Sequence, residues 1–190
     1  MEPIILASAS PRRKQLLEWA EIAFEQRVIP TDESYPPGLE IEEVPVVIAR
    51  NKALAVKRER VGGSGASRII LAADTVVVLG QEIIGKPRDR EDAIDILSRL
   101  SGQRHQVITG VVLLNEEKEL AFSDITTVWF HELSLMQISA YVDKYQPFDK
   151  AGAYAIQEWI GVVGIKAIEG DFYNVMGLPV SRVFRALQEF

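Results

Sequence analysis

The sequence predicts a mixed α/β fold in which a twisted sheet is flanked by helices. Runs rich in Val, Ile and Leu alternate with segments of helical periodicity, which is typical of layered α/β proteins. The order of elements departs from a strict strand–helix–strand repeat, so we expect a mixed sheet. The chain has 190 residues, 47% of them hydrophobic, which is enough for a sizeable core. We expect a single domain over residues 1–190, compact or divided into two small lobes that share a core.

The N-terminal segment predicts a strand, a helix and a second strand. The continuous apolar run at residues 4–7 suits a strand that is covered on both faces. Ser10 is a preferred N-cap residue and Pro11 fits the first helical position, so a helix should follow over residues 11–20. Residues 24–29 have the composition of a second strand.

The middle of the chain continues this alternation. Residues 30–40 are rich in Pro, Asp, Glu and Gly, and predict a polar loop long enough for a functional role. An apolar stripe predicts a helix over residues 43–61, ended by the glycine-rich residues 62–65. Residues 69–79 are almost unbroken β-type sequence, followed by a hairpin turn and a return strand at 82–84.

The C-terminal part predicts further strands and helices. We expect, in order, a helix at 89–100, strands at 106–114 and 120–130, and a last helix at 179–188. Between them, Ser134 is expected to cap a helix that runs to about residue 145. The dipeptide Gly170-Asp171 is a strong hairpin signal. Residues 161–168 and 172–175 are therefore predicted to form two paired strands.

Composition excludes several classes of protein. The chain has no cysteine and two well-separated histidines, His105 and His131, which argues against disulfide scaffolds, cysteine nucleophiles and zinc cages. The net charge of −6 gives no broad basic surface, so we expect no stable binding to nucleic acid. No window has the ~20 apolar residues of a membrane span, and residues 3–9 do not resemble a signal peptide. We expect a cytoplasmic protein with no membrane association.

Two arginines lie where a helix normally carries acidic residues. Arg12 and Arg13 occupy the first turn of the predicted helix, where the helix dipole disfavours cations. Beside Ser8, Ser10 and the unpaired N–H groups of the helix, two guanidinium groups suit a bound phosphate. Alternatively, both arginines point into solvent or pair with acids such as Glu18.

Asp74 interrupts a run of residues that otherwise has the composition of a buried strand. A buried carboxylate without a partner costs several kcal/mol, so Asp74 needs one. Because ligand sites in α/β sheets gather at strand ends, Asp74 is a candidate metal ligand or general base. The alternative is that Asp74 and Thr75 form a turn that merely links two strands.

Two lysines are candidates for phosphate binding. Lys86 lies in a predicted loop, where lysines are usually solvated. Lys52 lies at the edge of a helix stripe, where a lysine usually snorkels, with its stem on apolar surface and its charge in water. Together with the two arginines they would supply the positive charge that a triphosphate with one divalent ion needs. Asp32 and Glu33 in the polar loop could help to hold that ion, for which Mg²⁺ is the natural choice.

Gln157 is a candidate for reading a nucleotide base. It follows a stretch of small residues where a flat ring can approach the backbone, and its amide both donates and accepts hydrogen bonds. The alternative is an ordinary loop glutamine whose amide bonds only to neighbouring backbone.

These segments jointly resemble the Maf family of nucleoside triphosphate pyrophosphatases. The resemblance spans essentially the whole chain, and six motifs match in order and spacing. They are Ser8-Ala9-Ser10-Pro11-Arg12-Arg13, Ala73-Asp74-Thr75, Gly85-Lys86-Pro87, Leu100-Ser101-Gly102, Asp149-Lys150-Ala151-Gly152-Ala153-Tyr154 with Ile156-Gln157, and Gly177-Leu178-Pro179.

The resemblance implies a two-lobed α/β protein with a deep cleft and a divalent metal, Mg²⁺ or Mn²⁺. The implied reaction cleaves a nucleoside triphosphate between the α and β phosphates, giving the monophosphate and pyrophosphate. A homodimer is also implied. The family has been named for inhibiting septum formation, so a non-enzymatic regulator of cell division is the competing interpretation.

The resemblance also assigns roles to individual residues. Asp74 is the implied catalytic base. From the residues themselves we also expect Asp74 and Glu33 to bind the metal and Lys86 to act in catalysis. Phosphate binding falls to Ser8, Arg12, Arg13, Lys52 and Lys86, and base specificity to Arg12, Thr75 and Gln157.

The implied substrates depend on the branch of the family. The Tyr-x-Ile-Gln pattern resembles the branch acting on dTTP and UTP, rather than the branch acting on methylated GTP. The chain departs from the usual glycines of that branch at Ala155 and Glu158. If these two positions border the base pocket, the departure bears on nucleotide preference, and 7-methyl-GTP is the alternative substrate.

Overall fold

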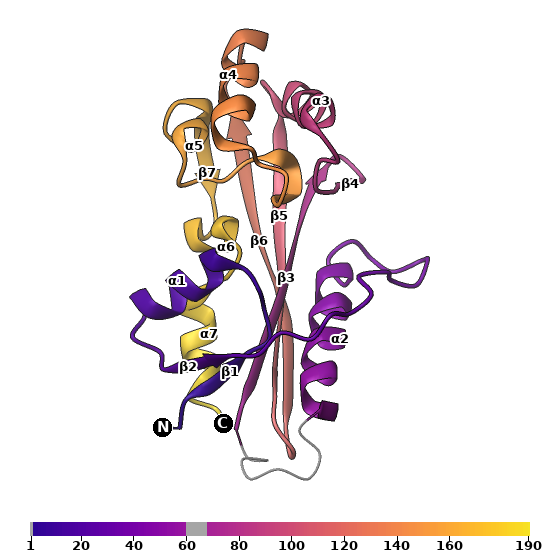
Figure 1. Cartoon of the computed structure of the whole chain (residues 1–190), viewed down its shortest axis with the longest axis vertical. Helices are drawn as coiled ribbons and strands as arrows, with labels where there is room; N and C mark the ends of the chain where they lie inside the picture. The colour runs from indigo at the N-terminus through magenta and orange to yellow at the C-terminus, as the bar shows by residue number, and fades with distance from the viewer. Residues whose placement is uncertain (1, 60–67) are drawn as a thin grey trace. The chain divides into compact units, whose positions relative to one another are not determined.

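The computed structural model describes residues 2–59 and 68–190 (Figure 1). The strands are β1 (Ile4–Leu6), β2 (Phe24–Gln26), β3 (Ile70–Leu79), β4 (Glu82–Ile84), β5 (Arg104–Leu114), β6 (Glu119–Phe130) and β7 (Ile165–Glu169). The helices are α1 (Pro11–Trp19), α2 (Val44–Glu59), α3 (Arg90–Leu100), α4 (Leu135–Tyr145), α5 (Trp159–Gly164), α6 (Phe172–Met176) and α7 (Val180–Leu187), with a short 3₁₀ helix, η1 (Ala151–Ala153). The glycine-rich residues 62–65, expected to end the long helix, lie outside the described residues.

The strands of the described residues form one mixed sheet of seven, in the order β2-β1-β3-β5-β6-β7 with β4 on β3. Strand β1 pairs in parallel with both β2 and β3. Strand β4 is antiparallel to β3, and β7 is antiparallel to β6. This mixture of directions confirms the predicted α/β class with a mixed sheet. None of the helices in the two described ranges is long and apolar enough for a membrane crossing.

The chain divides into two compact units. Unit 1 contains Met1–Asp74, Thr109–Asp124 and Gly177–Phe190, and unit 2 contains Thr75–Ile108 and Ile125–Met176. The division falls inside β3, between Asp74 and Thr75, and it also divides β5 and β6. Of the candidate site residues, Thr75, Lys86 and Gln157 fall in unit 2 and the others in unit 1.

The core of unit 1 holds α2 against the sheet. Buried residues of β1, β3 and β5 pack with Ala49, Ala53 and Val56 of α2. The start of α2 lies so close to β5 that a Cβ on Gly110 would be 2.2 Å from the backbone N of Val46. Only glycine fits such a backbone contact. Helix α2 is consequently a fixed support for Lys52, which it carries.

Capping residues begin the helices where the sequence predicts. The Ser10 side chain accepts a hydrogen bond from the backbone N of Arg13, and Pro11 follows in the first turn of α1. Ser134 forms a capping box with Gln137 at the start of α4. These caps satisfy N–H groups that the helices leave without internal partners.

The predicted hairpin around Gly170-Asp171 is wrong. The structure has α5, β7 and α6 in place of two paired strands, and β7 pairs with β6. Gly170 does make a sharp turn, with φ of 123°. After that turn Asn174 is fully buried, and its amide nitrogen donates to Val107 O at 3.1 Å and Thr126 Oγ1 at 3.0 Å. These long-range contacts override the local hairpin signal.

Candidate functional site

In unit 1, the turn between β1 and α1 is organised around Arg13. The Arg13 side chain is buried; its Nη1 donates to Ser8 Oγ at 2.9 Å, and its Nε donates to Gly177 O at 2.7 Å. Ser8 is also buried, and its Oγ accepts from the backbone N of Ser10 at 3.3 Å. The interpretation that both arginines point into solvent or pair with Glu18 is therefore wrong for Arg13.

Neighbouring acids partly offset the cost of burying the charge of Arg13. Burial lowers the pKa of Arg13, the negative charges of Asp74 and Glu33 act in the opposite direction, and the charge of Arg12 adds to the lowering. A buried cation is costly unless anions lie nearby. A phosphate bound at this turn would consequently stabilise Arg13 further. Arg12 is half-buried in the same turn.

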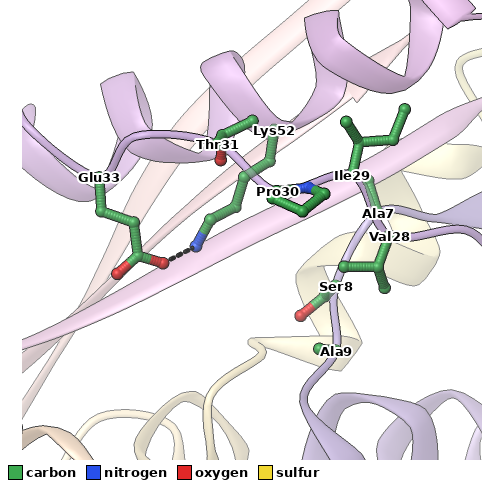
Figure 2. Close-up of a pocket in the computed structure, with 9 residues that line it drawn as sticks. All are labelled: Ala7, Ser8, Ala9, Val28, Ile29, Pro30, Thr31, Glu33 and Lys52. Carbon is green, nitrogen blue, oxygen red and sulfur yellow. Dashed lines mark ion pairs between the residues drawn. The ribbon is translucent and has the colours of Figure 1, made fainter.

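Three charged side chains from different parts of unit 1 meet at Lys52. Its Nζ lies 2.7 Å from Glu33 Oε1 and 2.7 Å from Asp74 Oδ1. Figure 2 shows the ion pair with Glu33. Lys52 comes from the middle of α2, Glu33 from the polar loop and Asp74 from β3. The exposed fractions of the Lys52 and Asp74 side chains are 17% and 15%, against 50% for Glu33. Lys52 is thus neither a solvated nor a snorkelling lysine, and Asp74 has the partner that its burial requires.

Asp74 does not form a turn between two strands. It lies with Thr75 inside the continuous strand β3, where both residues are partly exposed between fully buried positions. The alternative of a linking Asp-Thr turn is therefore wrong. Asp74 also lies in the middle of β3 and not at the strand end that we expected.

A pocket of about 200 Å³ opens beside this cluster in unit 1. Apolar and polar side chains line it, as Figure 2 shows: Ala7, Ser8, Ala9, Val28, Ile29, Pro30, Thr31, Glu33 and Lys52. Pockets for whole drug-sized ligands begin at about 300 Å³. The pocket is smaller than that, and Ser8 and Lys52 give it a hydroxyl and an ammonium group, which suit anionic oxygens.

Asp32 is hydrogen-bonded within its own loop. Its carboxylate accepts hydrogen bonds from Ser34 N at 2.9 Å and Ser34 Oγ at 2.6 Å. The Ser34 bonds hold the pKa of the Asp32 carboxyl below its usual value. Within the described ranges, no three or more Asp, Glu, His or Cys side chains gather as a metal cage. Glu33, rather than Asp32, is the acid of this loop that meets Asp74 through Lys52.

The remaining predicted residues belong to unit 2. Thr75 is partly exposed in β3, Lys86 is exposed after β4, and Gln157 is exposed in a turn before α5. The loops of Lys86 and Gln157 are linked within this unit, because Gly152 N donates to Gly85 O at 3.1 Å.

Gly152 can be replaced only with strain. Its φ is 71°, and an added Cβ would lie 2.9 Å from the Val77 side chain. Glycine alone adopts this conformation without strain and leaves room for the contact. The loop that leads to Gln157 is therefore docked on β3 at a defined place.

A charged network in unit 2 was not predicted as part of a site. Lys150 is buried, with its Nζ 2.7 Å from Asp149 Oδ1 and 3.7 Å from Glu158 Oε1. The Tyr141 hydroxyl donates to Glu158 Oε2 and accepts from Ala155 N. The sequence indicates Tyr141 only as a core aromatic residue. The signal that could have pointed to Lys150 as a site residue is its place in the motif that begins at Asp149.

A family model described as "Maf-like protein" matches residues 3–190. A dTTP/UTP pyrophosphatase of Cytophaga hutchinsonii is 50% identical over 186 residues, which are 98% of this chain and 83% of the relative. The dTTP/UTP pyrophosphatase of Porphyromonas gingivalis W83 is 47% identical, covering 98% of this chain and 94% of the relative. The dTTP/UTP pyrophosphatase of Bacteroides fragilis ATCC 25285 is 46% identical, covering 98% of this chain and 95% of the relative. The match to the family model and these identities over nearly the full chain show that the chain belongs to the Maf-like protein family.

Proposed function

We propose that this chain hydrolyses dTTP and UTP to the nucleoside monophosphate and pyrophosphate. The family and the enzyme names of its relatives support a nucleoside triphosphate pyrophosphatase. The structural observation that carries the proposal is the Lys52 ammonium held between Glu33 and Asp74, beside a pocket that also contains Ser8. Such a cluster combines a carboxylate for proton transfer with a cation for phosphate oxygens.

In the proposed reaction Asp74 acts as the general base. One carboxylate oxygen bonds to Lys52, and the carboxylate can accept a proton from the water that attacks the α-phosphorus. The bond from the α-phosphorus to the oxygen bridging to the β-phosphate breaks, and pyrophosphate leaves. Lys52 and Lys86 balance the charge that develops on the phosphate oxygens.

Ser8, Arg12 and Arg13 are the proposed phosphate-binding residues of unit 1. The turn that contains them begins α1, whose first N–H groups and dipole favour an anion. Thr75 and Gln157 of unit 2 are the proposed base contacts. Uracil and thymine present one N–H donor and carbonyl acceptors on their pairing edge, which an amide such as that of Gln157 can match.

A divalent cation, Mg²⁺ or Mn²⁺, fits the acids of unit 1. Asp74 and Glu33 approach a common positive charge, Lys52 Nζ, so the two carboxylates already converge on one cation. Mg²⁺ is usually bound by one or two carboxylates together with substrate phosphates. Asp74 and Glu33 would hold the ion, which supplies Lewis-acid neutralisation of phosphate charge when bound.

Pyrophosphate release from a panel of nucleotides tests the proposal. The panel contains dTTP, UTP, dCTP and 7-methyl-GTP, each with and without Mg²⁺. We expect release from dTTP and UTP that requires the metal. Release from 7-methyl-GTP alone would contradict the assignment of dTTP and UTP as substrates. No release from any nucleotide would favour a non-enzymatic regulator.

A further inference from the structure

The turn that carries Gln157 is held at both ends by one phenol hydroxyl. Tyr141 of α4 accepts a hydrogen bond at Oη from Ala155 N at 3.2 Å and donates its own proton to Glu158 Oε2. Glu158 N donates to Ala155 O at 3.1 Å, which closes the turn. Gln157 is exposed between these two anchors, whereas Ile156 is buried. The backbone at Gln157 is therefore fixed by residues on either side of it.

The Glu158 side chain bonds to the residue that holds this turn and does not cap the helix that follows. Glu158 is the N-cap residue of α5, yet its side chain makes no capping hydrogen bond. One carboxylate oxygen accepts from Tyr141, and the other lies 3.7 Å from Nζ of the buried Lys150. Lys150 is also 2.7 Å from Asp149 Oδ1. The Glu158 carboxylate is thus directed toward a phenol and a cation of the same unit.

Tyr141 is a rigid anchor for these bonds. Its side chain is 1% exposed, and its ring stacks on Tyr145 with centroids 4.9 Å apart. Burial, with the Glu158 hydrogen bond as the next cause, raises the pKa of Tyr141. The hydroxyl therefore keeps its proton at neutral pH and acts as the donor to the carboxylate.

We propose that Tyr141 and Glu158 are positioning residues that set discrimination between nucleotide bases by fixing Gln157. This inference rests on the proposed function, in which Gln157 contacts the base. A site that reads a base by hydrogen bonds discriminates strongly only when its donors and acceptors are held in place. Tyr141 and Glu158 act through the turn, so they affect the base contact and leave the triphosphate contacts unchanged.

The ratio of kcat/KM for dTTP to kcat/KM for dCTP tests the inference, because these substrates share sugar and triphosphate. Tyr141→Phe keeps the stacked ring and removes the hydroxyl, and should lower the ratio about tenfold. Glu158→Ala should lower it similarly, whereas Glu158→Gln keeps an acceptor for the phenol and should retain most of the ratio. Tyr145→Phe, which removes a hydroxyl from the neighbouring stacked ring, is the matched control and should retain the wild-type ratio.

A double variant distinguishes positioning from a general loss of structure. In a Gln157→Ala background the added Tyr141→Phe change should lower the ratio no further, because the residue it positions is gone. A further loss there would overturn the inference, as would a wild-type ratio in both Tyr141→Phe and Glu158→Ala. If Tyr141→Phe fails to fold, the two Glu158 variants test the inference. A lower ratio in Glu158→Ala than in Glu158→Gln supports it, and equal ratios in the two would overturn it. Wild-type protein that hydrolyses no nucleotide would overturn the proposed function as well, whereas unchanged ratios in active variants would overturn the inference alone.

Discussion

Lys52 Nζ lies 2.7 Å from a carboxylate oxygen of Asp74, and the two residues are 22 positions apart in the sequence. The contact joins the middle of α2 to the middle of β3 and leaves both side chains largely shielded from water. Ion pairs that are shielded in this way interact more strongly than surface pairs. The same ammonium also pairs with Glu33, so one cation holds these two acids close together.

Lys52→Met should abolish most turnover. The change removes the cation between Glu33 and Asp74 and the charge proposed to face the phosphates. Loss of one such electrostatic contact costs about 10²–10³ in kcat. The steady-state rate of dTTP hydrolysis checks this, with Lys57→Met as control, because Lys57 lies on the same helix and pairs with Glu116. Equal rates in the two variants would count against a role for Lys52.

Arg13→Ala should raise KM for every nucleoside triphosphate to a similar extent. Arg13 is proposed to bind phosphate, which all these substrates share. It also donates to Ser8 and Gly177, so the free energy of unfolding should fall by about 2–4 kcal/mol. Lys14→Ala on the same helix is the control, since Lys14 is exposed and pairs with Glu18. A rise in KM confined to one base would contradict a phosphate role.

His105 should make the protein less stable as the pH falls from about 6.5 to about 4. Burial lowers the pKa of His105 from 6.5 to about 4, so between these values the unfolded chain binds a proton that the folded chain does not. The free energy of unfolding therefore falls with decreasing pH, by on the order of 3 kcal/mol across this window.

Denaturant unfolding at pH 7 and pH 4.5 measures this effect. His105→Gln cannot titrate and can still bond to the Tyr154 hydroxyl, which lies 2.8 Å from His105 Nε2. The loss of stability between the two pH values should be smaller in His105→Gln than in the wild type. His131→Gln, a change at an exposed histidine, should behave as the wild type. The same loss in all three proteins would show that His105 is not the cause.

Local signals in the sequence predict much of the fold and less of the site. The N-caps Ser10 and Ser134 begin helices as predicted, because a cap depends on residues within one turn. Gly170-Asp171 predicts a hairpin that is absent from the described residues, because burial of Asn174 and pairing of β7 with β6 decide that region. Contacts between distant segments are not encoded in local periodicity.

In the candidate site, too, the sequence predicts what depends on local signals and misses what depends on contacts between distant segments. Arg13 and Asp74 stand out in the sequence because a cation in a first turn and an acid in an apolar strand are unusual locally. The pairing of Lys52 with Asp74 depends on how α2 packs on the sheet, which Gly110 permits without any local signal. The role of Tyr141 was missed for a similar reason, since its hydroxyl bonds to residues 14 and 17 positions away.

Pyrophosphate release by Asp74→Asn tests the central claim most directly. The amide is nearly isosteric with the carboxylate but cannot serve as the base, and loss of a general base costs about 10²–10⁴ in rate. Asp124→Asn is the control, because Asp124 is a partly exposed acid of β6 that pairs with Arg182. We predict that Asp74→Asn folds and binds dTTP but loses turnover, while Asp124→Asn retains it. Undiminished turnover in folded Asp74→Asn would contradict the assignment of Asp74 as the catalytic base.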